Sequence, residues 1–348
     1  MKILFISDRR EGGIKRHVQC LRSCLPPEVE HYTIGEDEPF AGKSGHDWRE
    51  LVQICRVIRS SSPDIVHFHT PNFLMALGAR VMGCKLVCSW HTPTNRKMGL
   101  GARAFFWLLG KKCYFLPVSS ATWDGLKKWL PYAQGEVFYN PLKVNKIQGD
   151  MIMEDLASVS SADSPTKRIF GGLVKVIGMV GRSDPEKGWQ AYAEVAGAIK
   201  EVEVWGIGVN EDEAFEKFGS AAGAVDWKGM QPNGREWIRK MDLFVLTSKH
   251  EEMPTVVLEC FAEGTPICGF IPEGGMSEIL SFSNGALREV FIEERSCEKL
   301  SEIVKRLLAD EKLRKRVVED GWQILVHHFD AEKNCREQLM DIYRRIAK

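Results

Sequence analysis

The stretch LFVLTSKHEEMPTVVLECFAEGTPICGF, residues 243–270, predicts a strand, a helix and a second strand in succession. Its apolar ends predict buried strands over Leu243–Leu246 and Pro266–Phe270. Between them, Pro254 is suited to a first helical turn, and the segment after it predicts a helix over Thr255–Glu263. Buried strands joined by a helix are typical of a parallel sheet that is covered on both faces. This unit therefore predicts an α/β fold.

The same alternation of strand and helix extends back to the N-terminus. The strands expected there are Ile3–Ser7, Val29–Ile34, Asp64–Phe68, Lys85–Ser89, Tyr114–Val118 and Glu136–Tyr139. The helices expected there are Ile14–Leu25, Arg49–Ser60, Phe73–Met82, Gly101–Lys112 and Ala121–Trp129. This rhythm predicts one parallel sheet with helices between its strands.

A second series follows a polar interruption between Lys146 and Gly172, which we interpret as an interdomain connection. Its further strands are expected over Val174–Val180, Glu203–Trp205 and Ala224–Trp227, and its further helices over Trp189–Ile199, Glu211–Phe218, Gly234–Lys240, Met276–Leu280, Cys297–Ala309, Lys312–His327 and Ala331–Ile346. We therefore predict two Rossmann-like domains, residues 1–165 and 166–329. Ligands should bind in the cleft at the carboxyl ends of their strands.

The composition is that of an ordinary globular protein, with 44% hydrophobic and 27% charged residues. This excludes collagen-like and disordered chains. No segment reaches the ~18 consecutive apolar residues of a membrane span. The N-terminal run MKILFISD is too short for the core of a signal peptide, so we expect no export.

Ten cysteines are scattered without a C-x-x-C pair, which favours a reducing, cytoplasmic environment. His17, Cys20 and Cys24 could share one helix face and imitate metal ligands. A fourth ligand is missing, and a buried helix face explains these residues better. We therefore expect no zinc.

The net charge is zero, but it is unevenly distributed. Residues 1–170 hold 23 Lys and Arg against 16 Asp and Glu, whereas residues 171–348 hold 24 against 31. Between Ile65 and Gly149, 11 basic residues face only Asp124 and Glu136. The first domain should therefore present a positive surface to an anionic partner. We expect no nucleic-acid partner.

Three loops carry the residue types of an anion site. Gly12 and Gly13 follow the first strand and allow a close backbone approach to a ligand before a helix N-terminus, although a tight turn explains them equally well. In the loop from Gly181 to Gly188, Arg182 and Lys187 can converge on one diphosphate; the alternative is a solvated loop in which Lys187 pairs with Glu186.

The third loop runs from Glu251 into the helix over Thr255–Glu263. The free backbone N–H groups of Thr255, Val256 and Val257 should bind an anion there. Glu259, about one turn further along, needs a hydroxyl or a cation as a partner because its helix is otherwise apolar. Glu263 is expected to be exposed or to cap the helix.

In this order, the motifs Gly-Gly, G-R-x4-K-G and E-x7-E resemble the retaining GT-B glycosyltransferases of family 4, the group 1 glycosyltransferases. Further matches follow the same order: Asp64–His69, Ser89–Thr92, Val118-Ser119, Tyr139–Pro141, Gly206 and Gly208, Lys228–Met230, and a Phe329…Tyr343 pattern. The resemblance implies two Rossmann-like domains that face a cleft, with residues 330–348 forming a helix that crosses back to the N-terminal domain.

The resemblance also implies roles for these residues, with a UDP- or GDP-sugar as co-substrate and no cofactor. Gly181, Arg182 and Lys187 would hold the donor diphosphate, Glu259 the ribose, and Glu251 a hydroxyl of the transferred sugar. His91 matches an active-site histidine near that sugar. Backbone contacts to the donor would come from Met253, Pro254, Thr255 and Val256, contacts to the base from Gly229 and Met230, and closure over the phosphates from Gly12 and Gly13.

Two departures bear on the site. Glu252 stands where the family usually has a small residue, and Arg9-Arg10 precede the glycines, so the donor-sugar pocket and the acceptor entrance should carry unusual charge. The chain has no Asp-x-Asp pair for a divalent ion on the diphosphate. We therefore expect positive side chains and helix N-termini to replace the metal.

The acceptor is expected to be a glycan or a lipid-linked molecule. A basic, aromatic segment around Ala104–Leu109 could contact an anionic membrane or could pack as an ordinary helix. Acceptor contacts are expected from Arg9, His69, Arg96, Lys97 and Arg103. The protein would then act in the cytoplasm, at the inner face of the membrane, in the synthesis of cell-surface polysaccharide or lipopolysaccharide. The alternatives are a nucleotide-sugar epimerase and a non-catalytic protein that binds nucleotide or glycan.

Overall fold

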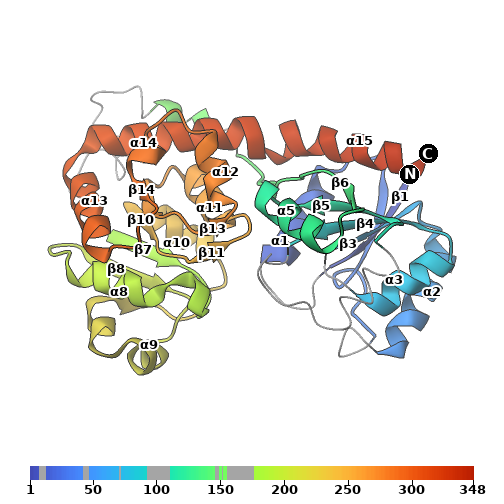
Figure 1. Ribbon diagram of the computed structural model, residues 1–348, viewed down its shortest axis with the longest axis horizontal. Helices are drawn as coiled ribbons and strands as arrows, with labels where there is room; N and C mark the ends of the chain where they lie inside the picture. The colour runs from blue at the N-terminus through green and yellow to red at the C-terminus, as the bar shows by residue number, and fades with distance from the viewer. Residues whose placement is uncertain are drawn as a thin grey trace. The chain divides into compact units, whose positions relative to one another are not determined.

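The structure is a computed structural model that describes residues 1–7, 13–41, 47–69, 72–91, 110–145, 149–150, 152–154 and 176–348. It divides into two units, each with its own sheet (Figure 1). Unit 1 comprises Met1–Lys143 and Phe329–Lys348, and unit 2 comprises Val144–His328. The boundary between them lies at Lys143, earlier in the chain than residue 165.

Unit 1 is built on a six-stranded parallel sheet in the order β2-β1-β3-β4-β5-β6. The strands are β1 (Lys2–Ile6), β2 (Glu30–Ile34), β3 (Ile65–Phe68), β4 (Lys85–Trp90), β5 (Cys113–Pro117) and β6 (Gln134–Gly135). Alternate residues of β1 enter two different cores, since Leu4 and Ile6 lie in one and Ile3 and Phe5 in the other. The sheet is therefore buried on both faces, as the continuous apolar runs predict.

The helices of unit 1 divide between these two faces. Residues of α2 (Trp48–Ser61), α3 (Phe73–Val81) and α5 (Ser120–Trp129) pack in the core of Leu4 and Ile6. Residues of α1 (Gly13–Cys24) and of the last helix, α15 (Arg336–Ala347), pack in the core of Ile3 and Phe5. The C-terminal helix therefore belongs to the N-terminal sheet, as predicted.

Unit 2 repeats the arrangement with a six-stranded parallel sheet in the order β14-β12-β10-β7-β8-β9. The strands are β7 (Val176–Val180), β8 (Glu203–Ile207), β9 (Asp226–Trp227), β10 (Leu243–Leu246), β12 (Ile267–Phe270) and β14 (Phe291–Ile292); a separate pair is formed by β11 (His250–Glu251) and β13 (Glu273–Gly274). The helices are α8 (Trp189–Gly197), α9 (Glu211–Phe218), α10 (Gly234–Lys240), α11 (Thr255–Glu263), α12 (Met276–Ser281), α13 (Cys297–Ala309) and α14 (Glu311–Ile324). Two parallel sheets with helices between their strands confirm the predicted α/β class.

The predicted strand over Glu136–Tyr139 is wrong. The strand at this edge, β6, ends at Gly135. The apolar side chains that follow it pack instead against the C-terminal segment: Phe138 lies in the core shared with α15, and the ring of Tyr139 lies 5.1 Å from that of Phe329. Of the helix expected over Gly101–Lys112, Gly110–Lys112 form a turn and residues 101–109 lie outside the described residues. Among the described residues, no helix is long and apolar enough to span a bilayer.

Candidate functional site

The sheet of unit 2 reverses its strand order between β7 and β10. The chain builds β7, β8 and β9 in one direction and then returns to place β10 on the other side of β7. Ligands of open α/β sheets bind in the crevice outside the carboxyl ends of the strands at such a reversal. The segment after β7 carries Arg182 and Lys187, and Glu251 ends the two-residue strand β11 that follows β10. The topology therefore brings two of the predicted motifs to one position.

Lys187 and Glu251 are in direct contact at this position. Lys187 Nζ donates to Glu251 Oε1 at 2.6 Å, and both side chains are largely shielded from solvent. The hydroxyl of Ser248 donates to the same oxygen at 2.7 Å. The partner of Lys187 is therefore Glu251 rather than Glu186, which the solvated-loop interpretation required. A cation and an acid are held side by side, each with its polar atom directed by the other.

The loop that carries Lys187 is fixed by its backbone. Asp184 caps the short helical turn Pro185–Lys187 by accepting from the N–H of Glu186 at 3.0 Å. Gly188 has φ +71°, and a Cβ there would lie 2.1 Å from the carbonyl oxygen of Thr247. Glycine is therefore needed for the loop to approach the end of β10. Arg182 is exposed, and its carbonyl accepts from Trp189 Nε1 at 2.9 Å.

Two residues of this site were missed by the sequence analysis. Ser248 contacts Glu251 as described, and Arg295 donates to the carbonyl oxygens of Thr247 at 2.6 Å and Ser248 at 2.9 Å. The guanidinium of Arg295 also lies over the ring of Phe270 at 4.6 Å. Ser248 is close enough to Glu251 in the chain to have been considered. Arg295 follows the short strand β14, and no motif marks it.

At the start of α11, one part of the predicted anion site needs correction. Met253 and Pro254 are buried, Thr255 and Val256 are half-buried, and no side chain among the described residues caps this helix. The N–H of Val257, however, donates to the carbonyl of Pro254 at 3.0 Å. The prediction that Val257 offers a free N–H is therefore wrong. Glu259 lies half-buried one turn into the helix.

Glu263 is neither exposed nor a cap, contrary to prediction. Its side chain is fully buried and forms ion pairs with Arg235 and with Arg239, both on α10. Arg239 Nε donates to Glu263 Oε2 at 2.6 Å. The two arginines are much less buried, with side-chain exposures of 27% and 60%. The prediction failed because the cations that satisfy Glu263 come from another helix and have no fixed spacing from it.

The segment predicted to read the base lies at the same carboxyl edge. Gly229 and Met230 follow β9, and Gly181 follows β7 and donates its N–H to Ile207 at the end of β8 at 2.9 Å. Gly229 has φ +63°, and its carbonyl accepts from the N–H of Gly208 at 2.7 Å. The next residue, Met230, is 69% exposed. The segment predicted to contact the base therefore follows a strand on the side of β7 opposite β10.

Glu252, the unusual acid of the E-x7-E motif, is paired with a neighbouring base. His250 Nε2 lies 2.5 Å from Glu252 Oε1, and both side chains are mostly buried. The hydrogen bond to Glu252 is the largest cause that raises the pKa of His250, with smaller contributions from the charges of Glu252, Glu273 and Glu186. The negative charge of Glu252 is therefore neutralised by its neighbour when His250 is protonated.

In unit 1, the predicted histidines lie at the ends of neighbouring strands. His69 directly follows β3 and is buried, and His91 directly follows β4 and is half-buried. The rings of His17, on α1, and His91 have centroids 4.9 Å apart. Burial lowers the pKa of His17 and of His69 well below the usual range. Gly13 begins α1, whereas Gly12, Arg9, Arg96, Lys97 and Arg103 lie outside the described residues.

His67 packs between the sheet and the last helix. Its Nδ1 lies 2.6 Å from the hydroxyl of Tyr343 on α15, and its Nε2 lies 2.9 Å from the hydroxyl of Ser89 on β4. Burial, with a smaller contribution from the charge of His91, lowers the pKa of His67 to about 3. His67 is therefore a neutral, hydrogen-bonded core residue.

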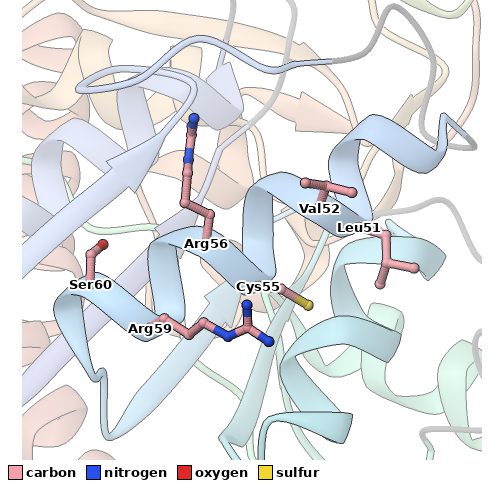
Figure 2. Close-up of a pocket in the computed structure, with 6 residues that line it drawn as sticks. All are labelled: Leu51, Val52, Cys55, Arg56, Arg59 and Ser60. Atoms are coloured by element: carbon pink, nitrogen blue, oxygen red, sulfur yellow. The ribbon is translucent and has the colours of Figure 1, made fainter.

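A surface depression on α2 contains none of the predicted site residues. Leu51, Val52, Cys55, Arg56, Arg59 and Ser60 line it (Figure 2). All six belong to one helix, which packs against α3. This depression therefore makes no contribution to the candidate site.

Two family models match successive parts of this chain. Residues 10–145 match the model for Glycosyltransferase Family 4, and residues 174–310 match the model for Glycosyl transferases group 1. Together the two matches include motifs of both units from Gly12 to Glu259, but not the Phe329…Tyr343 pattern.

The chain is also similar to individual proteins. It is 28% identical over 172 residues to the lipopolysaccharide core biosynthesis glycosyltransferase LpsE of Rhizobium meliloti, which is 48% of each chain. It is 28% identical over 177 residues to the N,N'-diacetylbacillosaminyl-diphospho-undecaprenol alpha-1,3-N-acetylgalactosaminyltransferase of Campylobacter jejuni, which is 50% of this chain and 45% of that one. The matched region thus spans about half the length of these relatives.

Among solved structures, HepE of Anabaena in complex with UDP and glucose is similar along its whole length. The superposition has a TM-score of 0.72 and covers 99% of this chain and 100% of HepE, with 16% sequence identity. At this identity the similarity shows the fold, two Rossmann-like domains of the GT-B type, and confirms that prediction.

Proposed function

Because this chain belongs to the group 1 glycosyltransferases of the GT-B fold, we propose that it transfers a hexose from a UDP- or GDP-sugar to a glycan or lipid-linked acceptor with retention of configuration. The observation that carries the proposal is the contact between Lys187 and Glu251 at the strand-order reversal of unit 2. It joins the two motifs that the family uses for the donor.

In this proposal, positive charge stabilises the leaving group. Arg182 and Lys187 would neutralise the departing diphosphate, and the N–H groups at the start of α11 would add partial positive charge. Glu251 would hold Lys187 in place and accept from a hydroxyl of the transferred sugar. Glu259 would accept from the ribose hydroxyls. No divalent cation is required on the diphosphate, since these groups supply the charge.

The sugar would be transferred by attack on the face from which the diphosphate leaves. The acceptor hydroxyl oxygen forms the new bond to the anomeric carbon as the bond to the phosphate oxygen breaks. The acceptor proton passes to that phosphate oxygen. His91 would lie near the transferred sugar, whereas His69 and the basic residues Arg9, Arg96, Lys97 and Arg103 would contact the acceptor.

The acceptor and the compartment are proposed from charge and chemistry. The positive excess between residues 65 and 149 suits a phosphorylated or membrane-embedded acceptor in surface polysaccharide or lipopolysaccharide synthesis. The names of the two curated relatives, one from lipopolysaccharide core synthesis and one acting on a diphospho-undecaprenol, support this class. All ten cysteines are free, which supports a reducing cytoplasm, with peripheral contact at the inner face of the membrane.

The test is a panel of UDP- and GDP-sugars, first in thermal denaturation and then in transfer assays without added divalent ions. A donor at 100 times its Kd should stabilise the protein by ~2.7 kcal/mol. Transfer should require an acceptor, should survive EDTA, and should give a product with the anomeric configuration of the donor by NMR. Conversion of the donor without acceptor would indicate an epimerase, and binding without turnover a non-catalytic protein. Loss of turnover that Mg²⁺ or Mn²⁺ restores would contradict metal independence.

A further inference from the structure

Three imidazoles meet at the carboxyl edge of the sheet of unit 1. His17 lies on α1, which follows β1, while His69 directly follows β3 and His91 directly follows β4. One ring nitrogen from each lies within 4.8 Å of the corresponding nitrogens of the other two. The strand order of this sheet reverses between β1 and β3. The three histidines therefore occupy the position at which open α/β sheets bind ligands.

Two of these histidines are buried without hydrogen bonds. His17 is 5% exposed and His69 1%, and within the described residues neither ring nitrogen of either side chain has a hydrogen-bond partner. Buried polar groups in native proteins are normally satisfied, so such a group needs an explanation, which includes an ion. The neighbouring His67 shows the contrast, because Tyr343 and Ser89 engage both of its nitrogens.

The donor set is chemically specific. Three imidazole nitrogens suit zinc and related divalent transition metals, and three protein ligands leave a fourth position for water or a ligand. Magnesium and calcium prefer oxygen ligands, so this group does not favour them. Three neutral ligands also leave the charge of the ion uncompensated, which favours an anionic oxygen in the open position.

We propose that His17, His69 and His91 form a binding site for one divalent transition metal ion, with zinc as the favoured metal and the fourth position open. The site belongs to unit 1 and is argued from its own geometry, although its ligands include His91 and His69, which the proposed function places near the transferred sugar and the acceptor. It uses none of the donor residues of unit 2. It replaces the set of His17, Cys20 and Cys24 that the sequence suggested as possible ligands, since the fold brings two histidines from other loops to His17.

The experiment measures metal binding by the full chain. Protein stripped with EDTA and dialysed is titrated with Co²⁺ and, separately, with Zn²⁺ against a chromophoric chelator. We expect one ion per chain and the visible absorption of tetrahedral Co²⁺ with nitrogen ligands. The variants H17Q, H69Q and H91Q should each lose this binding. His31→Gln, an exposed histidine on β2 of the same sheet, is the matched control and should keep it.

Other outcomes would overturn the proposal. Failure of the stripped protein to take up Zn²⁺ would show that water or protein groups satisfy the imidazoles. Near-ultraviolet charge transfer from thiolate to Co²⁺, or binding that persists when H17Q, H69Q and H91Q are combined in one protein, would place the metal elsewhere. Circular dichroism and the melting temperature of each metal-free variant show whether it is folded. A folded variant that binds no metal has lost a ligand, whereas an unfolded one says nothing of the ligands. If a glutamine variant does not fold, Zn²⁺-dependent thermal stabilisation of the wild type but not of the folded variants decides the point.

Discussion

At the scale of single residues, Lys187 is held by Glu251 and Ser248, whereas Arg182 is exposed. We predict that Arg182→Ala and Lys187→Ala each lower kcat/KM by ~10²–10³-fold, which corresponds to about 2.7–4 kcal/mol of lost transition-state stabilisation. The reason is that each removes positive charge from the departing diphosphate. Steady-state kinetics at several donor concentrations measures the effect.

Lys249 provides the matched control for this pair. It is exposed and lies in the loop after β10, two residues before Glu251. Lys249→Ala removes the same charge from the same edge of the sheet but should keep most of the turnover. Wild-type kinetics in either Arg182→Ala or Lys187→Ala would remove that residue from the site.

Substitutions of the two carboxylates of the E-x7-E motif should affect the binding of different parts of the donor. Glu259→Gln should weaken binding of free UDP or GDP, because the ribose is common to the nucleotide and its sugar derivative. Glu251→Gln should lower transfer and leave the affinity for the free nucleotide nearly unchanged, because it removes the anion paired with Lys187 but not Lys187 itself. Calorimetry with the nucleotide alone measures its affinity for each of the two variants. Equal weakening by the two variants would mean that the roles are assigned wrongly.

The pair of His250 and Glu252 should make stability depend on pH. Glu252, with Glu273 and Glu186, raises the pKa of His250 above its usual 6.5. The folded state then binds the proton more tightly than the unfolded state, so the stabilisation is full below pH 6.5 and is lost as pH rises through the raised pKa. The advantage of wild type over Glu252→Gln in urea denaturation should therefore shrink above pH 6.5. An advantage that grew with pH would contradict this assignment.

At the scale of elements, Glu263 joins α11 to α10 through Arg235 and Arg239. We predict that replacing both arginines by Met destabilises the protein by about 3–5 kcal/mol, because it removes the two cations that pair with the fully buried carboxylate. Glu263→Gln should cost less, since the partly exposed arginines can turn to water. Urea denaturation gives both values.

Arg316 is a control for this comparison. It pairs with Glu289 at 2.7 Å, and both side chains are about half exposed. Arg316→Met should cost less than about 1 kcal/mol, as exposed ion pairs usually do. If Glu263→Gln proved more damaging than the double arginine variant, the buried carboxylate would not be the group that needs compensation.

At the scale of the whole molecule, charge separates the two halves of the chain, with an excess of seven basic residues in 1–170 and seven acidic residues in 171–348. We predict that the protein binds vesicles containing anionic lipid at low salt and is released as the Debye length falls to ~8 Å at physiological salt. Changing Arg103, Lys111 and Lys112 to Ser should weaken binding by about 3 kcal/mol, since each basic residue near the surface contributes ~1 kcal/mol. Sedimentation with anionic and neutral vesicles measures it.

A triple change in unit 2 controls for net charge. Lys299, Lys305 and Lys312 are exposed on α13 and α14; changing all three to Ser removes the same charge and should leave vesicle binding unchanged. Lys111 and Lys112 are exposed in a turn, and Arg103 lies outside the described residues. A protein that ignores anionic vesicles at low salt would point to a soluble acceptor.

Local sequence was sufficient for most of the fold and for the donor motifs. The strand over Leu243–Leu246 and the helices over Thr255–Glu263 and Cys297–Ala309 begin and end where their apolar patterns predict. A helix buries one stripe of side chains and a half-buried strand buries every second one, so the spacing of apolar residues along the sequence indicates which element forms. That Lys187 and Glu251 lie at one edge of the sheet also follows from the sequence, because the segments after parallel strands meet at their carboxyl ends, but their direct contact was not predicted.

Tertiary structure decided every contact between side chains that are distant in the chain. The partners of Glu263 lie on another helix, Arg295 follows a strand of two residues, and His17 meets His69 and His91 rather than the cysteines of its own helix. Phe138 resembled part of a strand because an apolar residue looks the same whether a neighbouring strand or the last helix covers it. A sequence pattern records that a group must be buried or paired, but the partner is set by which elements the topology places side by side.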